Sequence, residues 1–183
     1  MIVDFTMPEH SKKQMITRKS HFYIFLIILS SLMFYSSSAV SERARYLDDL
    51  EDWNKGSVII QIDPNNSIKF KVLIAESNKE RRQGLMHIEA MENDEGMLFI
   101  FDPGRNVSMW MRNTPMPLDM IFINKEGRII NIAKNTTPYS TKGISSGGII
   151  NWVLEINGGL SDRMNIKNGD LVSFNLIRDP DEE

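Results

Sequence analysis

The stretch from Met109 to Asp119 gathers side chains that are suited to bind a small molecule. Tryptophan offers a flat face for stacking, arginine and asparagine donate hydrogen bonds, and aspartate accepts them. The sequence therefore predicts a ligand-binding corner formed by Trp110, Arg112, Asn113 and Asp119. The alternative use of these residues is structural. In that case Asp119 accepts hydrogen bonds from backbone N–H groups of the proline-containing loop before it and pairs with Arg112.

Four methionines lie within the twelve residues from 109 to 120, and these are Met109, Met111, Met116 and Met120. Thioether sulfur is a soft ligand that selects Cu(I) where thiolates are missing. On a strand, Met109 and Met111 point to one side and Trp110 to the other. The pattern therefore permits a Cu(I) site. Packing is the competing interpretation, because methionine fills irregular cores and this chain contains 12 methionines.

The chain has no cysteine, which excludes disulfides, thiol nucleophiles and zinc–thiolate centres. The segment Gly143–Gly147 matches G-x-S-x-G, the turn that carries the nucleophile of α/β-hydrolases. That turn requires a following helix and a later histidine, and no histidine lies beyond His87. We therefore expect no catalytic role for Ser145 and no cofactor.

Asp119 and Glu155 are the only acidic residues in strongly apolar surroundings, and nothing in the sequence places them together. A pair of carboxylates for acid–base catalysis is therefore not identified, and we expect Glu155 to face solvent from a strand. The sequence favours a domain that is not an enzyme. A hydrolase acting on cell-wall or carbohydrate material, with Asp119 as acid or base, is the alternative.

The first 39 residues have the layout of a secretory signal. Lysines and an arginine precede the apolar run from Phe22 to Tyr35, and small residues follow it up to Ala39. We expect cleavage after Ala39, translation from Met15, and a soluble periplasmic or other extracytoplasmic protein. An uncleaved anchor is the alternative, because 22 uncharged residues separate Lys19 from Glu42 and about 20 span a bilayer. Only this segment is then expected to contact the membrane.

Charge makes nucleic acid a poor partner. The whole chain has a formal net charge of −3, and removal of residues 1–39 takes away four basic and two acidic side chains, which leaves −5. Such a surface repels anionic polymers. The expected partner is a small ligand or an envelope protein. The expected organisation is a signal or anchor over 1–39, a charged linker over 40–55, a β domain over 56–178, and an acidic tail over 179–183.

The β domain is predicted from short apolar runs separated by turn residues. Eight such runs are expected to be strands, at residues 57–63, 68–74, 97–101, 107–111, 120–124, 128–133, 149–156 and 171–177. The turn Lys125-Glu126-Gly127 predicts a hairpin between the runs 120–124 and 128–133, with glycine where a positive φ is needed. Ser77 and Glu80 form a capping box that predicts one short helix over Asn78–Gln83, ending at Gly84. Because helices and strands do not alternate, we expect an all-β sandwich or barrel of seven or eight short strands. The irregular loop 139–148 is a second candidate functional segment.

Several short motifs together resemble the domain of unknown function 192 family. They are Arg82–Met86, Gly96–Phe99, Met109–Thr114, Pro117–Asp119, Gly127–Ile129, Leu154–Asn157 and Gly169-Asp170. The resemblance covers about residues 57–178, and it implies a compact β domain in envelope-targeted proteins without supplying a reaction. His87 stands where the family more often has arginine.

The leading functional hypothesis is a binding module of the cell envelope that uses the Trp110–Asp119 corner and the loop 139–148. A purely structural accessory role is a further alternative.

Overall fold

A computed structural model describes residues 47, 50 and 52–177. The predicted signal or anchor, most of the predicted linker and the acidic tail lie outside these residues. Within the part that is described, no helix combines the length and the apolar character needed to cross a membrane. Leu47, Leu50 and Trp53 fall in the stretch expected to be a charged linker, yet they pack against the apolar core of the β domain.

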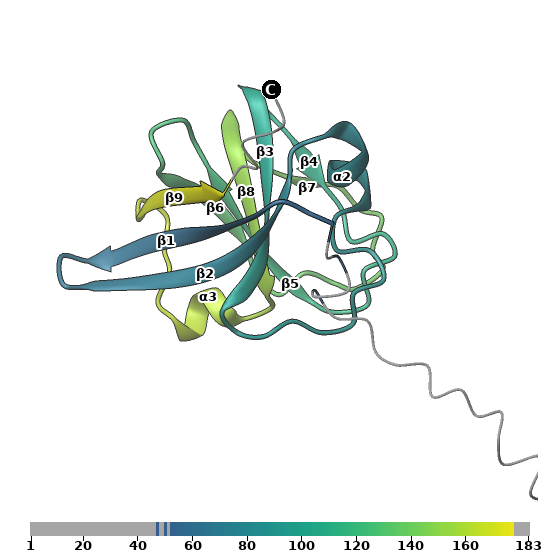
Figure 1. Ribbon diagram of the computed structural model, residues 1–183, viewed down its shortest axis with the longest axis horizontal. Coiled ribbons are helices and arrows are strands. Elements are labelled where there is room, and N and C mark those ends of the chain that lie inside the picture. The colour runs from purple at the N-terminus through teal and green to yellow at the C-terminus, as the bar shows by residue number, and fades with distance from the viewer. Residues whose placement is uncertain (1–46, 48–49, 51, 178–183) are drawn as a thin grey trace, which may run out of the picture. The chain divides into compact units, whose positions relative to one another are not determined.

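The domain is built on a seven-stranded sheet with the strand order β6-β5-β8-β3-β2-β1-β9 (Figure 1). Its strands are β1 (Lys55–Asp63), β2 (Asn66–Ala75), β3 (Glu95–Arg105), β5 (Leu118–Ile123), β6 (Ile129–Ala133), β8 (Ile150–Asn157) and β9 (Leu171–Ile177). A second, two-stranded sheet pairs β4 (Ser108–Met109) with β7 (Ile144–Ser145). The two described helices are α2 (Asn78–Gln83) and α3 (Leu160–Arg163).

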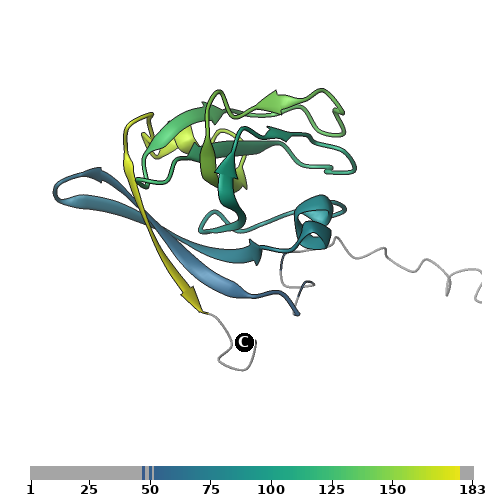
Figure 2. The ribbon, with the colours of Figure 1, turned by 90° about the horizontal axis from the view of Figure 1, so that it is seen from above.

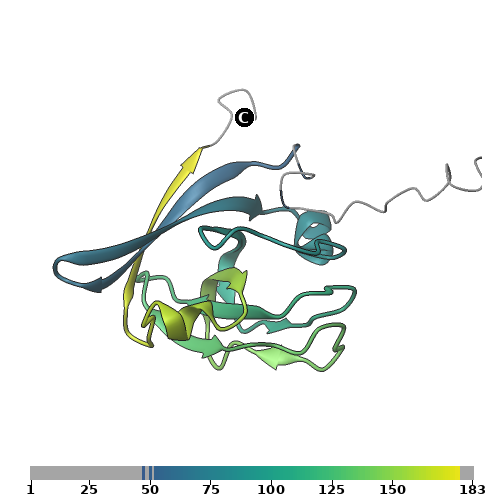
Figure 3. The ribbon, with the colours of Figure 1, turned by 90° about the horizontal axis from the view of Figure 1, so that it is seen from below.

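The large sheet curls until its two ends meet at one place. In Figures 2 and 3 the yellow strand β9 begins beside the β5–β6 hairpin and crosses to the side of the β1–β2 hairpin. The Val172 N–H donates to the Gly127 carbonyl at 2.7 Å, and the Ile129 N–H donates to the Asp170 carbonyl at 3.1 Å. The described domain is therefore mostly β, with a curled half-barrel and two short helices, in place of the expected sandwich or barrel with one helix.

Local signals placed several elements correctly. The Ser77 Oγ accepts a hydrogen bond from the Glu80 N–H at 3.2 Å, and the Glu80 carboxylate accepts one from the Ser77 N–H at 2.7 Å. The predicted capping box is thus present, and α2 ends at Gly84 with a φ of 47°. The predicted hairpin between β5 and β6 also forms, and it uses Gly127 at a φ of 73°.

Other features of the sheet were not predicted. β2 and β3 pair in parallel, and α2 lies in the connection between them. β4 covers only two residues of the expected strand 107–111, while β7 and α3 were not anticipated. Both are too short for a periodic pattern of apolar residues to appear in the sequence. β1 pairs with β9 as well as with β2, so that Lys55 lies opposite Ile177.

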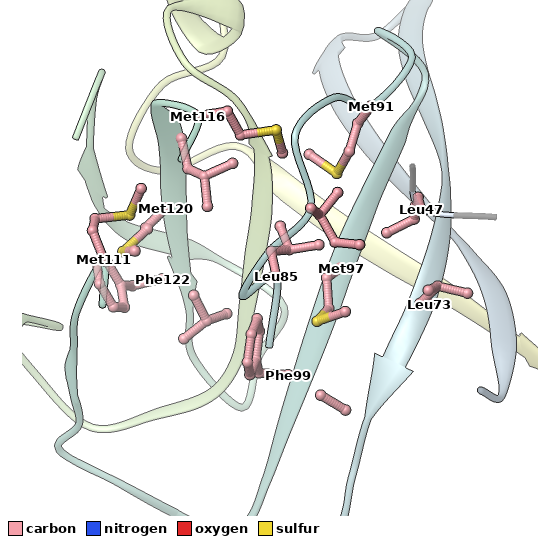
Figure 4. Close-up of a cluster of buried hydrophobic side chains, with 14 of the residues drawn as sticks. Leu47, Leu73, Leu85, Met91, Met97, Phe99, Met111, Met116, Met120 and Phe122 are labelled. Carbon is pink, nitrogen blue, oxygen red and sulfur yellow. The ribbon is translucent and has the colours of Figure 1, made fainter. Parts of the chain in front are cut away.

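Both faces of the sheet bury apolar side chains, which explains why most central strands read as nearly continuous apolar runs. One cluster takes residues from all seven strands, among them Val58, Leu98 and Val172, as expected for the concave face. The other cluster lies between the opposite face and the segments that follow α2 and β4, and includes Leu85, Met97 and other side chains (Figure 4). Functional side chains gather at the border of this second cluster.

Candidate ligand-binding site

A cavity of about 220 Å³ lies between α2, the end of β3 and the segment from Val107 to Thr114. Its basic lining residues are Arg81, Arg82, Arg105 and Arg112. The aromatic and most of the apolar lining comes from Leu85, Met86, Phe99, Phe101, Met109 and Trp110. Among the lining residues, Glu155 is the only acid. The cavity therefore combines a strongly cationic border with an apolar body and one carboxyl group.

Two of the arginines are held against Phe101, whose side chain is 6% exposed. The guanidinium carbon of Arg81 lies 5.5 Å from the ring centroid, and that of Arg105 lies 5.1 Å from it. Arg81 is also fixed by hydrogen bonds, since its Nη1 donates to the Ile100 carbonyl at 2.8 Å and its Nη2 donates to the Asn78 Oδ1 at 2.7 Å. Hydrogen bonds thus hold the Arg81 side chain in place at the cavity, while Arg105 is exposed to solvent.

The other two arginines, Arg82 and Arg112, are exposed. The salt bridges among the described residues join Lys71 to Asp94 and Lys134 to Asp162, so none involves an arginine of the cavity. Guanidinium groups are preferred hydrogen-bond donors for carboxylate and phosphate. These side chains are therefore available to a ligand that carries an anionic group.

Trp110 borders the cavity with 47% of its surface exposed. Its neighbour Met111 is fully buried, and Met109 is partly buried against the same core cluster. The methionine side chains therefore turn inward at this point and the indole turns outward. An exposed tryptophan next to free donors offers a stacking surface at a place where a ligand can enter.

Glu155 lies on β8, and its environment corrects the expectation that it faces solvent. Its exposed fraction is 3%, and it sits opposite Met97 of β3 and Met120 of β5 in the centre of the sheet. The alternation of a strand gives one solvated side only where one face of the sheet is uncovered, and here both faces are covered. Burial raises the pKa of the Glu155 carboxyl from its ordinary value of 4.5 to about 8.

Asp119, the predicted acceptor, is fully buried and does not line the cavity. Its carboxylate accepts hydrogen bonds from the N–H groups of Asn135 at 2.6 Å, Gly159 at 2.8 Å and Ser161 at 2.8 Å, and also from the Ser161 hydroxyl. This arrangement is the structural use of Asp119 in an altered form. The N–H groups come from other loops than the proline loop, and Arg112 is not the partner but lines the cavity.

Asn113 also lies outside the cavity lining. It adopts a φ of 56°, its carbonyl accepts a hydrogen bond from the His87 N–H at 2.8 Å, and its amide Nδ2 lies 3.8 Å from the Met86 Sδ. Asn113 thus joins two turns that carry Met86 and Arg112 into the cavity. Of the four residues predicted to bind a ligand, Trp110 and Arg112 come together there.

The predicted metal ligands lie mainly in the core. Met111, Met116 and Met120 are buried among leucine and phenylalanine side chains (Figure 4), and the Met111 Sδ accepts a hydrogen bond from the Thr136 hydroxyl at 3.1 Å. Their position agrees with packing, and the Cu(I) site stays a prediction. In the described ranges, no group of three or more histidine, cysteine, aspartate or glutamate side chains is placed to hold a metal ion.

The loop 139–148 supports the cavity without lining it. Its strand β7 pairs with β4, and the Ser146 hydroxyl accepts a hydrogen bond from the Val107 N–H at 3.1 Å and donates one to the Gly148 carbonyl at 2.7 Å. Ser145 is exposed. Sequence reasoning missed Arg81, Arg82 and Arg105 as site residues. A usable signal for the first two was the capping box, which sets both on one short helix.

The fold and the cavity define a class of protein, namely a mostly β domain with a curled seven-stranded sheet and a cationic cavity beside its short helix α2. Residues 59–174 match the DUF192 family, which is described as an uncharacterized ACR. The chain belongs to this family, as its motifs predicted.

Two solved structures are similar to the domain. One is a protein from Sinorhizobium meliloti 1021, provisionally described as a transcription regulator, with 37% identity, a TM-score of 0.65, and coverage of 67% of this chain and 95% of that chain. The other is a protein of unknown function from Novosphingobium aromaticivorans DSM 12444, with 38% identity, a TM-score of 0.62, and coverage of 64% of this chain and 83% of that chain. No curated protein matches the sequence.

Proposed function

We propose that this domain is a binding protein for a small organic anion, which it takes into the cavity beside α2. The observation that carries the proposal is the exposed set Arg82, Arg105 and Arg112 next to the exposed indole of Trp110, all on one cavity. Guanidinium groups bind carboxylate or phosphate oxygens in pairs, and the indole offers a face to a flat or apolar body. The ligand is therefore expected to combine an anionic group with a ring.

The volume of the cavity limits the size of this ligand. Cavities for drug-sized ligands hold roughly 300–1,000 Å³, whereas this one holds about 220 Å³. A single substituted ring fits that space better than a nucleotide or an oligosaccharide. Recognition then depends on a few strong contacts, because a ligand of this size buries little apolar surface.

The number of acidic side chains at the cavity favours binding over hydrolysis. Glycoside hydrolysis ordinarily uses two carboxyl groups on opposite sides of the scissile bond. Glu155 is the single acid among the described lining residues, and Asp119 has its carboxylate oxygens occupied by loop N–H groups and the Ser161 hydroxyl. The geometry supports a binding module more strongly than a hydrolase acting on cell-wall or carbohydrate material.

Titration calorimetry on the protein isolated from cells tests the binding proposal. Benzoate and phenyl phosphate are expected to bind, and neutral benzamide much less. Arg112→Ala is expected to weaken benzoate about tenfold or more, since a hydrogen bond to a charged group contributes roughly 1.5–3 kcal/mol. Trp110→Ala is expected to abolish measurable binding, because it removes the stacking face.

Two variants serve as controls for these measurements. Arg163→Ala removes an exposed arginine on α3 that is not part of the cavity lining, and Ser145→Ala removes an exposed hydroxyl on β7. Both are expected to bind benzoate as the wild type does. Equal affinities for benzoate and benzamide, or equal losses in Arg112→Ala and Arg163→Ala, would contradict the proposal.

We also propose that the protein is exported and works outside the cytoplasm. The basic flank, the apolar run 22–35 and the small residues before Val40 support this. The mass of the protein recovered from the cell envelope is expected to correspond to a chain that begins at Val40. A mass that includes residues 22–35 indicates an anchor instead, and recovery of the protein only in the cytoplasm would refute export.

A further inference from the structure

We propose that Glu155 determines which anions the cavity accepts: it stays protonated and donates its hydroxyl hydrogen to an oxygen acceptor of the ligand. The site would then prefer ligands with an anionic group at the arginines and an uncharged acceptor oxygen at the other end. It would disfavour ligands that carry an ammonium group there. This inference rests on the proposed function, because it assigns the chemistry of the same ligand more closely.

The first support is the position of the Glu155 side chain. It lines the cavity although its exposed fraction is only 3%. No hydrogen bond joins its carboxyl group to another described residue, yet no buried side-chain oxygen or nitrogen in the described part is both sealed from solvent and without a partner. The carboxyl oxygens therefore keep access to the cavity, where a ligand is the available partner.

The second support is the set of charged groups on the elements packed around Glu155. β3 and β5 present methionines, Met97 and Met120, in register with it. The charged residues that share the cavity are Arg81 and Arg82 from α2, Arg105 from the end of β3, and Arg112. Of these, Arg81 is tied to the Ile100 carbonyl and to Asn78, and the other three are exposed. None forms a salt bridge with Glu155.

The third support is the balance of donors and acceptors. Guanidinium groups and the indole N–H only donate hydrogen bonds, so the border of the cavity calls for a ligand rich in acceptors. A buried carboxyl without a cationic partner is kept neutral by desolvation, and a neutral carboxyl adds one more donor. An ammonium group would have to enter past several arginines, and it would then require Glu155 to ionise.

Two probes that share a ring and a carboxylate test this selectivity. Monomethyl terephthalate carries ester oxygens opposite its carboxylate, and 4-(aminomethyl)benzoate carries an ammonium group there. At neutral pH the wild type is expected to bind the ester about tenfold more tightly than the amine. The ester gains a hydrogen bond from Glu155, whereas the ammonium group of the amine is left without a charged partner. Its affinity for the ester is expected to fall as the pH rises above about 8, where Glu155 ionises.

Variants of Glu155 complete the experiment. Glu155→Leu is expected to weaken the ester about tenfold by removing the donor, and Glu155→Gln, whose amide also donates, is expected to recover most of that affinity without the fall at high pH. The infrared difference spectrum between the wild type and Glu155→Gln is expected to show the carbonyl band of a protonated carboxyl at neutral pH. Arg163→Ala is the control and is expected to behave as the wild type.

Opposite results would overturn the inference. Tighter binding of the amine, with loss of that binding in Glu155→Gln, would show that Glu155 acts as an anion. Absence of the protonated carbonyl band would also refute it. Failure of the proposed function has a different signature, because neither probe would then bind the wild type at all.

Discussion

Asp119→Ala is expected to unfold the domain at a much lower denaturant concentration than the wild type. The Asp119 carboxylate accepts hydrogen bonds from the backbone of two separate loops. One loop contributes the N–H group of Asn135, and the other contributes those of Gly159 and Ser161. Removing the carboxylate leaves three backbone donors without their acceptor, in a region where Ser161 is itself buried. Each buried donor left unsatisfied costs about 1–3 kcal/mol, so we expect a loss of about 3–5 kcal/mol in the free energy of unfolding.

Urea unfolding of matched variants checks this expectation. Ser161→Ala removes only the hydroxyl donor and is expected to cost about 1 kcal/mol. Glu155→Ala removes a buried carboxyl to which no described residue is hydrogen-bonded, and it is expected to cost less than Asp119→Ala. Equal midpoints for Asp119→Ala and Glu155→Ala would show that the network around Asp119 does not hold the two loops.

The free energy of unfolding is expected to fall as the pH rises from about 5 to about 8, and Glu155→Gln is expected to remove most of this fall. In the unfolded chain the Glu155 carboxyl ionises near its ordinary pKa of 4.5, and in the folded protein burial raises that pKa to about 8. Between these pH values the folded state holds a proton that the unfolded state releases, so raising the pH favours unfolding. The penalty at pH 8 is on the order of 4 kcal/mol.

Thermal unfolding of the wild type and Glu155→Gln at several pH values measures this effect. The two proteins are expected to differ little near pH 5, and Glu155→Gln is expected to be clearly the more stable near pH 8. Glu126→Gln, which removes a negative charge from the exposed turn between β5 and β6, controls for the change in net charge. Parallel stability curves for the wild type and Glu155→Gln would exclude a protonated Glu155 in the folded protein.

Local signals explain which parts of the fold were predictable. The capping box at Ser77 and the glycine at Gly127 fix a helix and a hairpin from a few neighbouring residues, and both were predicted correctly. The order of the strands and the parallel pairing of β2 with β3 depend on contacts between distant segments, for which one sequence carries no local signal. The curl of the sheet is also a property of the whole assembly.

The same distinction applies to the site. Trp110 and Arg112 were predicted because they lie in one short segment that is rich in polar and aromatic groups. The arginines of α2 and Glu155 of β8 join them only through the packing of α2 and the β4 segment over one face of the sheet. The position of Glu155 between Leu154 and Ile156 in an apolar strand was itself a sign that it could be buried. Alternation along the strand assigned it to solvent because the covering of the second face was not visible in the sequence.

The pairing of β1 with β9 determines when the domain can be completed. Lys55 opens the first strand of the sheet and lies opposite Ile177 of the last one. A chain that emerges from its N-terminus, from a ribosome or through a membrane pore, therefore holds β1 with one open edge until nearly the whole domain has emerged. Open strand edges invite pairing with other chains. The edge of β1 is thus open to such pairing until β9 takes its place beside it.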